Sequence, residues 1–228
     1  MNFNQRHILF EDNHLIIVNK KSGMLVQGDK TGDTTLIDHI KGFLKIKYNK
    51  PGEAFLGVIH RLDRPTSGVI VFAKTSKALS RLNLQFKERK IDKKYLAVTE
   101  KNLKTKSGKL KSWIIKNSKQ NKSYIHSKEV PGSKVAKLQY NLIQDLKNYI
   151  LLEIILETGR HHQIRAQLSN IGLTIKGDLK YGSKRSNNDG SIDLHAYQII
   201  FNHPVTKNII NIKAPLPNRE PWKSVLYD

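Results

Sequence analysis

The feature that most constrains the fold is a succession of short apolar runs that follow one another along the chain at hairpin-like spacing. Ala136, Leu138, Tyr140 and Leu142 occupy alternate positions, and a denser run at residues 149–156 follows after a short polar gap. Alternation with a period of two is typical of a half-buried strand. Strands that lie this close together in sequence favour antiparallel pairing.

Strands outnumber helices in the rest of the chain. Further strands are expected at residues 15–18, 69–72, 95–98, 194–201 and 209–212. Thr35 with Asp38 makes a capping start for one helix, Ser76 caps a second, and Gly172 stands where a glycine ends a third. The apolar faces of these helices are Leu36, Ile37, Ile40, Phe43 and Leu44; Leu79, Leu82 and Phe86; and Ile164, Leu168 and Ile171. The pattern predicts an α+β fold with a mixed, mainly antiparallel sheet, in a single domain over residues 1–228.

The charge of the chain favours a polyanionic partner. Forty Lys and Arg against 19 Asp and Glu give a formal charge of +21, and such an excess is most simply explained by binding to nucleic acid. A basic protein at a membrane surface is the alternative. No amphipathic helix with aromatic anchors is visible, and no stretch approaches the roughly 20 apolar residues that a membrane span needs.

Almost half of this excess lies in one lysine-rich segment, residues 101–137. It contains eleven Lys and a single acid, Glu129, and so carries +10. Ser107-Gly108 and Pro131-Gly132 are turn signals within it, on either side of a short apolar run at residues 113–115. We expect this segment to contact the backbone of the polyanionic partner.

The absence of cysteine excludes disulfides, thiolate zinc sites and a thiol nucleophile. The first apolar run, at residues 8–10, is too short for the core of a signal peptide. A cytoplasmic location is therefore expected.

The densest group of chemically capable residues is His60–Gly68, on a loop between two predicted strands. Asp63 has Arg61 two positions before it and Arg64 directly after it, so its ionised form is favoured. Such a carboxylate suits a nucleophile or a base better than an acid. The alternative is a surface aspartate in a turn between two exposed cations.

A second group lies at residues 158–165, where a strand ends and a helix begins. Arg165 follows His161 by four residues and His162 by three, so one helical face could carry all three. Adjacent histidines suggest a metal, but neighbours on a helix point about 100° apart, which suits joint ligation poorly. No metal site is predicted, and a basic turn that touches phosphate is the alternative.

Several other residues have ordinary structural interpretations when they are taken alone. Tyr95, after Lys94, is a half-buried strand tyrosine, and residues 177–182 form a glycine-bracketed turn that lacks the ending of a nucleotide-phosphate loop. His195 opens a strand and is expected to be buried. The stretch from Asn19 to Gly23 is by itself a polar turn.

Taken together, these segments resemble the RluA-type pseudouridine synthases in their order and spacing. The segments are His60–Gly68, Lys94–Ala97, Gly159–Arg165, Gly177-Asp178 with Tyr181-Gly182, and Leu194–Ala196. The resemblance covers roughly residues 8–215. The family's early turn usually reads Asn-Lys-Pro-x-Gly, and here Lys21 replaces the proline; position 161 is also variable in the family. The pattern begins within the first dozen residues, so the small RNA-binding module that many relatives carry before it is expected to be absent.

The resemblance implies an isomerase that converts a uridine in RNA to pseudouridine without a metal or any other cofactor. Asp63 matches the catalytic aspartate, which attacks the ribose C1′ or the uracil ring or otherwise assists glycosidic cleavage. Tyr95 matches the tyrosine that stacks on the target base, and Arg165 the arginine that pairs with the aspartate. Arg61 matches a residue that helps to displace the target nucleotide.

The resemblance also implies a bent sheet with an RNA-binding cleft across it. Further RNA contacts are expected from Arg64, Arg160, His161, Lys94, Lys109 and Lys111. The expected substrate is a stem-loop of ribosomal or transfer RNA, bound by a monomer with no obligatory protein partner. Two alternatives remain at this point: an inactive RNA-binding domain of the same fold, and a metal-dependent nuclease that would use His60, Asp63, His161 and His162.

Overall fold

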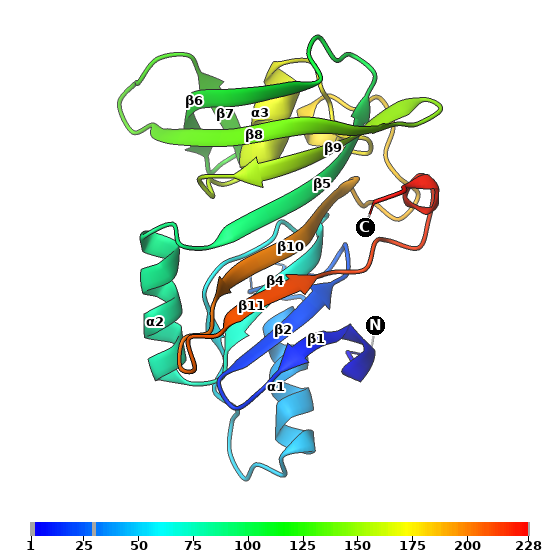
Figure 1. Cartoon of the computed structure of the whole chain (residues 1–228). Coiled ribbons are helices and arrows are strands. Elements are labelled where there is room, and N and C mark those ends of the chain that lie inside the picture. Colours follow the sequence, from blue (N-terminus) through cyan, green and yellow to red (C-terminus); the bar gives the residue numbers. More distant parts are fainter. Residues whose placement is uncertain (1–2, 29–30, 228) are drawn as a thin grey trace. The chain divides into compact units, whose positions relative to one another are not determined.

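The computed structural model describes residues 3–28 and 31–227. Contacts divide the chain into two compact units (Figure 1). The first unit comprises residues 1–91 and 196–215, and the second comprises residues 92–195 and 216–228. The expectation of a single domain over residues 1–228 stays a prediction.

Within the first unit the strands have the order β1-β2-β4-β10, with β11 paired to β10 and β3 paired to β4. These strands are β1 (Ile8–Glu11), β2 (Leu15–Lys20), β3 (Gly57–Val58), β4 (Ser67–Ala73), β10 (Leu194–Asn202) and β11 (Ile209–Lys213). Every pair here whose register is described is antiparallel. The strands expected at 15–18, 69–72, 194–201 and 209–212 are confirmed, whereas β3 was not foreseen.

Two helices belong to this unit, α1 (Leu36–Lys47) and α2 (Ser76–Lys87). Thr35 caps α1 as expected, because its hydroxyl accepts from the Asp38 N–H at 3.2 Å and Asp38 Oδ2 accepts from the Thr35 N–H at 2.9 Å. The expected cap of α2 was wrong by one residue. Thr75, not Ser76, has the extended backbone of a cap, and its hydroxyl accepts from the Ala78 N–H at 3.2 Å.

Within the second unit the strands have the order β5-β9-β8-β6-β7, and all of their described pairs are antiparallel. Its strands are β5 (Asp92–Glu100), β6 (Ser107–Asn117), β7 (Lys122–His126), β8 (Lys134–Asp145) and β9 (Tyr149–Leu156). The helix α3 (Gln163–Asn170) packs against β6 and β7. With strands in the majority and helices beside the sheets, the α+β prediction is confirmed.

One of the two turns predicted in the lysine-rich segment was wrong. Pro131-Gly132 does form a turn, with Gly132 at a φ of +78°. Ser107 and Gly108 instead begin β6, where Gly108 pairs with Tyr140 of β8. A Cβ on Gly108 would lie 2.7 Å from the Tyr140 ring and hydroxyl. This glycine therefore makes room for a cross-strand tyrosine and does not bend the chain.

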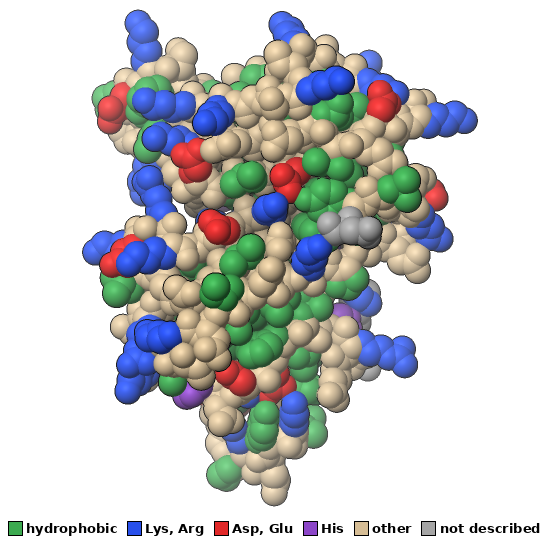
Figure 2. All heavy atoms as spheres, viewed as in Figure 1, with side chains coloured by type: hydrophobic (Ala, Val, Ile, Leu, Met, Phe, Trp, Pro, Cys, Tyr) green, Lys and Arg blue, Asp and Glu red, His purple; other side chains and the backbone are tan. Residues whose placement is uncertain are grey.

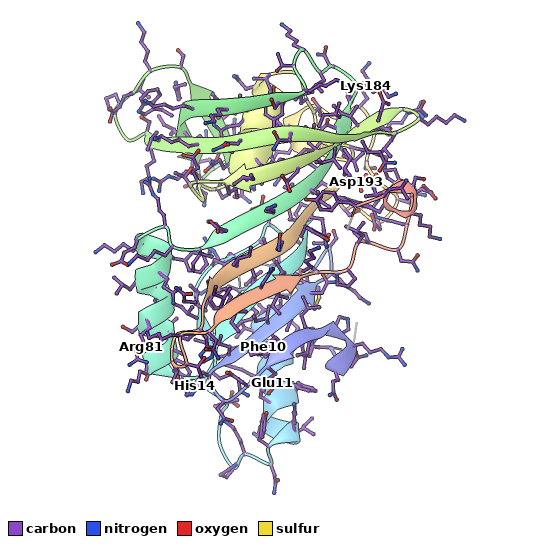
Figure 3. The ribbon with its side chains drawn as sticks, in the orientation of Figure 1. Phe10, Glu11, His14, Arg81, Lys184 and Asp193 are labelled. Carbon is purple, nitrogen blue, oxygen red and sulfur yellow. The ribbon has the colours of Figure 1, made fainter. Side chains whose placement is uncertain are left out.

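A buried carboxylate, that of Asp193, binds the C-terminal segment of the second unit. Asp193 has no exposed surface and accepts from the Trp222 indole N–H at 2.7 Å (Figure 3). It also pairs with Lys176 at 3.1 Å and with Arg219. Trp222 in turn packs edge-on against His195, which is buried as the sequence predicted.

In the first unit, Glu11 at the end of β1 joins three elements through ion pairs and a hydrogen bond (Figure 3). Its carboxylate lies 2.7 Å from the ammonium groups of Lys47 and Lys74 and accepts from the Tyr48 hydroxyl at 2.7 Å. Burial alone would raise the pKa of Glu11, but these three donors outweigh it and lower the pKa to about 2.

The depressed pKa of Glu11 predicts a specific loss of stability in acid. The stabilisation is fully present above the ordinary pKa of 4.5 and is lost as the pH falls toward about 2. Glu11→Gln should lower the free energy of unfolding by about 1–3 kcal/mol near neutral pH. The difference from wild type should shrink below pH 4.5, as measured by urea unfolding between pH 2.5 and 7. Glu53→Gln, at an exposed position, is the control and should change little; a wild-type advantage independent of pH would contradict the assignment.

Candidate functional site

The Asp63 loop connects β3 to β4 and is anchored at its first residues by His60. The Val71 N–H of β4 donates to Nε2 of His60 at 3.0 Å, and the His60 ring stacks on Phe86 of α2 at a centroid distance of 5.1 Å. Within the loop, the Thr66 N–H donates to the Asp63 carbonyl at 3.0 Å. Asp63 itself is half-buried, and Arg61 is exposed.

A buried lysine lies under this loop. Lys20, the last residue of β2, has no exposed surface, and its ammonium donates to the carbonyls of Thr66 at 2.7 Å, Arg64 at 3.1 Å and Lys21 at 3.1 Å. Its three N–H groups therefore each have an acceptor. Burial lowers the pKa of Lys20 to about 7; the Asp63 charge raises this pKa and the Arg64 charge lowers it, both by less than burial does.

The turn after Lys20 clamps the other side of the loop. The Gly23 N–H donates to the Arg64 carbonyl at 2.8 Å, and Arg64 Nε donates back to the Gly23 carbonyl at 3.1 Å. The Ser22 hydroxyl donates to the Pro65 carbonyl at 2.8 Å. Residues 20–23 and 63–66 thus form one hydrogen-bonded body, in which Arg64 serves partly as a clamp.

The loop ends at Gly68, where the side chain of any other residue would force neighbouring backbone atoms to move. Gly68 of β4 has a φ of +116°, and a Cβ there would lie 2.2 Å from the carbonyl oxygen of Ala196. Backbone atoms cannot yield as a flexible side chain could. The direction in which the chain leaves the Asp63 loop is therefore fixed by close packing of β4 against β10.

In the second unit, Tyr95 and Lys94 lie on β5. Tyr95 is 9% exposed. Lys94 pairs with Glu153 of β9 at 3.1 Å, and Glu153 also accepts from the Tyr227 hydroxyl. Because side chains alternate along a strand, Lys93 shares the face of Tyr95, and burial lowers the pKa of Lys93. The sequence pattern singled out Lys94 and missed Lys93.

Arg165 is held rigidly within α3. It is 5% exposed and makes a two-pronged ion pair with Asp178, with Nε to Oδ2 at 2.7 Å and Nη2 to Oδ1 at 2.8 Å. Its guanidinium carbon lies 5.0 Å from the centre of the Tyr181 ring. Asp178 and Tyr181 come from the glycine-bracketed turn, whose ionic role the sequence did not reveal. The expected pairing of Arg165 with Asp63 stays a prediction.

The two adjacent histidines support Tyr181. Nδ1 of His162 is 3.0 Å from the Tyr181 hydroxyl, which accepts from the Ser123 N–H at 2.8 Å. Burial, assisted by the charge of Arg165, lowers the pKa of His162 to about 2, so this ring is neutral. The helix α3 begins only after His162, which has a φ of +52°, so the expectation of one helical face carrying both histidines with Arg165 was wrong.

The ring of His161 also contacts protein groups on both sides. It stacks on His162 at 3.8 Å, and its nitrogens lie 2.8 Å from the Ser123 hydroxyl and 3.1 Å from Oδ1 of Asn121. Over the described residues, no group of three or more His, Asp or Glu is arranged to hold a metal ion. The histidine pair is therefore built into a hydrogen-bonded support for the Arg165 region.

Other predicted RNA contacts are spread over the second unit. Arg160 Nε donates to the Val135 carbonyl at 3.0 Å. Lys109 and Lys111 are exposed on β6, and the Lys111 ammonium lies 5.4 Å from the centre of the Trp113 ring. Figure 2 shows Lys and Arg side chains projecting from elements of both units.

These motifs occur in the order of a known family, and comparison with known sequences shows whether the chain belongs to it. Residues 14–170 match the profile of a family described as RNA pseudouridylate synthase. The chain belongs to the RNA pseudouridylate synthase family.

Individual relatives agree with this membership. The chain is 34% identical over 221 residues to the uncharacterized RNA pseudouridine synthase YhcT of Bacillus subtilis, covering 94% of this chain and 70% of that protein. It is 36% identical over 224 residues to ribosomal large subunit pseudouridine synthase C of Buchnera aphidicola subsp. Schizaphis graminum, covering 92% and 67%. The solved structure of human RNA pseudouridylate synthase domain containing 4 matches with a TM-score of 0.77 and 26% identity, covering 93% of this chain and 89% of that one.

The predictions of an RluA-type pseudouridine synthase, of an isomerase and of RNA as its substrate class are thereby confirmed. Within the described residues, no helix is long and apolar enough to cross a membrane. The roles of individual residues in this pseudouridine synthase rest on the geometry of the loops and on the family pattern.

The role of Lys20 beneath the Asp63 loop can be tested through stability. Lys20→Met keeps the length of the apolar stem but leaves three carbonyls without their donor, so the free energy of unfolding should fall by about 2–4 kcal/mol near pH 7. The folded-state pKa of about 7 lies below the ordinary 10.5, so the unfolded chain binds more protons and this group makes wild type more stable as the pH rises from 7.

Urea unfolding at pH 6.5 to 9 checks both effects. The gap between wild type and Lys20→Met should widen as the pH rises. Lys21→Met, at the exposed neighbouring position, is the control and should leave stability nearly unchanged. Equal stability of Lys20→Met and wild type would show that the ammonium does not hold the loop.

Proposed function

We propose that this pseudouridine synthase isomerises a uridine in structured RNA with Asp63, Tyr95 and Arg165 as its catalytic residues. The observation that carries the proposal is the construction of the Asp63 loop, in which Lys20 and the 21–23 turn bind the carbonyls on the C-terminal side of Asp63. A carboxylate held on a hydrogen-bonded loop can be presented to substrate in one orientation. The family pattern assigns the catalytic aspartate to this position.

The reaction requires one bond to be exchanged for another on the same ribose. The bond between N1 of the uracil and C1′ breaks, the base turns, and C5 bonds to C1′; C5 then loses its proton and N1 gains one. No electrons enter or leave, so carboxylate and proton-transfer chemistry is sufficient. Asp63 assists glycosidic cleavage, and Tyr95 stacks on the uracil and takes part in proton transfer.

Arg165 is the third residue of the assignment. Its fixed geometry comes from Asp178 and Tyr181, which hold the guanidinium plane in place. The neutral His162 adds no competing charge beside it. In the family pattern this arginine pairs with the catalytic aspartate, and Arg61 helps to displace the target nucleotide from its stack, at a cost of a few kcal/mol.

The substrate is proposed to be a stem-loop of ribosomal or transfer RNA. Relatives in Zymomonas mobilis and Buchnera aphidicola are named ribosomal large subunit pseudouridine synthases, which favours ribosomal RNA. Arg64, Arg160, His161, Lys94, Lys109 and Lys111 are the proposed RNA contacts. Exposed lysines next to an aromatic ring, as at Lys111 and Trp113, suit phosphate binding beside a stacked base. We further propose that the protein acts in the cytoplasm as a monomer, without a cofactor or an obligatory protein partner.

The catalytic assignment predicts that Asp63→Asn abolishes isomerisation. Removing the carboxylate charge while keeping the side-chain shape should reduce the rate by at least about a thousandfold, since the chemistry loses its only assigned anionic group. The measurement uses ribosomal and transfer RNA that lack their own pseudouridine, treated with protein and then with a carbodiimide whose adducts stop reverse transcription.

Asp92→Asn, the same chemical change at an exposed position of β5, should produce the wild-type pattern of stops. New stops with wild type and Asp92→Asn but not with Asp63→Asn support the assignment. Stops from all three proteins would remove Asp63 from the chemistry. Stops from none would leave an RNA-binding domain without this activity on the RNA supplied.

A further inference from the structure

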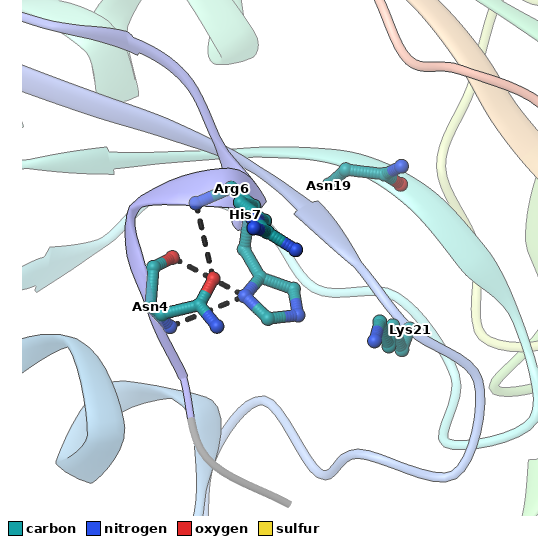
Figure 4. Close-up of a pocket in the computed structure, with 5 residues that line it drawn as sticks. All are labelled: Asn4, Arg6, His7, Asn19 and Lys21. Atoms are coloured by element: carbon teal, nitrogen blue, oxygen red, sulfur yellow. Dashed lines mark hydrogen bonds between the residues drawn. The ribbon is translucent and has the colours of Figure 1, made fainter.

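A second polar feature of the first unit lies beside the 20–23 turn and is separate from the proposed catalytic residues. It is a pocket of about 230 Å³ lined by Asn4, Arg6, His7, Asn19 and Lys21 (Figure 4). Two of these side chains are basic, one is an imidazole and two are amides. Among the described residues no carboxylate lines the pocket, so its chemistry is that of an anion site.

The wall formed by residues 4–7 is rigid. These residues make the short 3₁₀ turn η1 (Gln5–His7), in which the side chain of Asn4 accepts from the Arg6 N–H at 3.1 Å and the His7 N–H donates to the Asn4 carbonyl at 3.1 Å. The His7 ring is buried and stacks on Phe3 at 5.4 Å. The pocket therefore exists before any ligand arrives, which reduces the entropic cost of binding.

The ring of His7 is held in place at its Nδ1. This atom lies 3.2 Å from both the backbone nitrogen and the carbonyl oxygen of Asn4. Figure 4 shows Nε2 on the side of the ring that faces Lys21, so His7 presents the polar edge of its imidazole toward the pocket.

The two cations of the pocket are not committed elsewhere in the described structure. Arg6 and Lys21 are exposed, and neither side chain has an ion pair or hydrogen bond with a described residue. This distinguishes them from Lys20, Lys47, Lys74 and Arg64, whose charged groups bind carbonyls or carboxylates. Cations that remain available beside a buried imidazole are suited to a phosphate group.

The position of Lys21 connects the pocket with the Asp63 loop. The carbonyl of Lys21 accepts from the Lys20 ammonium at 3.1 Å, and the following residues, Ser22 and Gly23, are bonded to Pro65 and Arg64. A phosphate bound at Lys21 is therefore fixed to the same hydrogen-bonded body as Asp63.

We propose that the pocket formed by Asn4, Arg6, His7, Asn19 and Lys21 binds a backbone phosphate of the RNA substrate. In its choice of ligand this proposal rests on the proposed function. The pocket anchors the strand that carries the target uridine, and it does so through Arg6, Lys21 and the imidazole of His7. It adds to affinity and register and takes no part in the exchange of the glycosidic bond.

The test compares a pocket variant with a charge-matched control. Arg6→Gln/Lys21→Gln removes two cations from the pocket, and Lys45→Gln/Lys50→Gln removes two exposed cations of the same unit that lie outside it. Binding to a 20-nucleotide oligouridylate is measured from 50 to 300 mM salt. One lost phosphate contact should lower the slope of log Kd against log salt by about one and weaken binding about threefold to tenfold. The control should keep the wild-type slope and affinity to within about half of these changes.

A second measurement identifies the anion. Thermal unfolding is followed with inorganic phosphate at constant ionic strength, for wild type and the pocket variant. Stabilisation of wild type alone, together with an unchanged salt slope for the variant, would mean that the pocket binds free phosphate and would overturn the RNA assignment. Equal slopes and equal unfolding for all proteins would remove the pocket as an anion site.

The outcome for the pocket is separable from the outcome for the enzyme. Oligouridylate binding needs no isomerisation, so a loss of salt slope supports the pocket even if no RNA is modified. If RNA is modified, the pocket variant should show a raised KM on the modified transcript relative to Lys45→Gln/Lys50→Gln. A wild-type KM and a wild-type salt slope would reject the pocket while leaving the pseudouridine synthase activity intact.

Discussion

The first unit depends on one buried ammonium group. Lys20 extends from the end of β2 under the Asp63 loop and satisfies three carbonyls that would otherwise be buried without a donor. Placing a charge there is unfavourable, which is why burial brings its pKa down to about 7. The position of the loop is consequently set by a residue more than forty positions away in sequence, and by the sheet register that places Lys20 opposite Gly68.

The second unit also contains buried charged groups, but here they form a pair of opposite charges. Arg165 and Asp178 are both almost fully buried, and their two parallel hydrogen bonds offset the cost of removing them from water. Tyr181 covers the guanidinium, and the histidine pair with Ser123 fixes the tyrosine hydroxyl. The left-handed backbone at His162 belongs to this arrangement, because it ends the strand-to-helix connection with the imidazole turned toward Tyr181. Rigidity in both units therefore comes from buried polar groups and not from apolar packing alone.

Much of the fold could be predicted because its signals are local. The alternation along β8, the capping pair Thr35 and Asp38, and the glycine after α3 depend on neighbours within a few residues. The wrong predictions came from signals with two meanings. Ser107-Gly108 has the composition of a turn, but Gly108 is small because Tyr140 crosses it, and Thr75 and Ser76 are both acceptable caps by composition.

The candidate site likewise has residues that could be located from the sequence and residues that could not. Asp63, Tyr95 and Arg165 could be located because their motifs carry a family pattern, whereas Lys20 and Asp178 could not. A lysine at the end of a strand normally reaches solvent, and only the return of the chain at residues 64–66 buries this one. The partner of Arg165 lies thirteen residues away on a turn whose direction no local rule specifies. Long-range partners of buried charges are thus the part of a site that a single sequence reveals least.

The division of the chain into units also has a consequence for its synthesis. The first unit is interrupted after residue 91 and is completed only by residues 196–215, which supply most of β10 and all of β11. Until a ribosome has made that late segment, the part of β4 that later pairs with β10 has an open edge, and an apolar edge strand readily joins a neighbouring chain. In the second unit, the hydrogen bond from Trp222 to Asp193 can likewise form only after residue 222 has been made. During synthesis the strands of the first unit therefore stay incomplete until this late segment is made, and the yield of this enzyme in cells should depend on chaperones that shield the open edge.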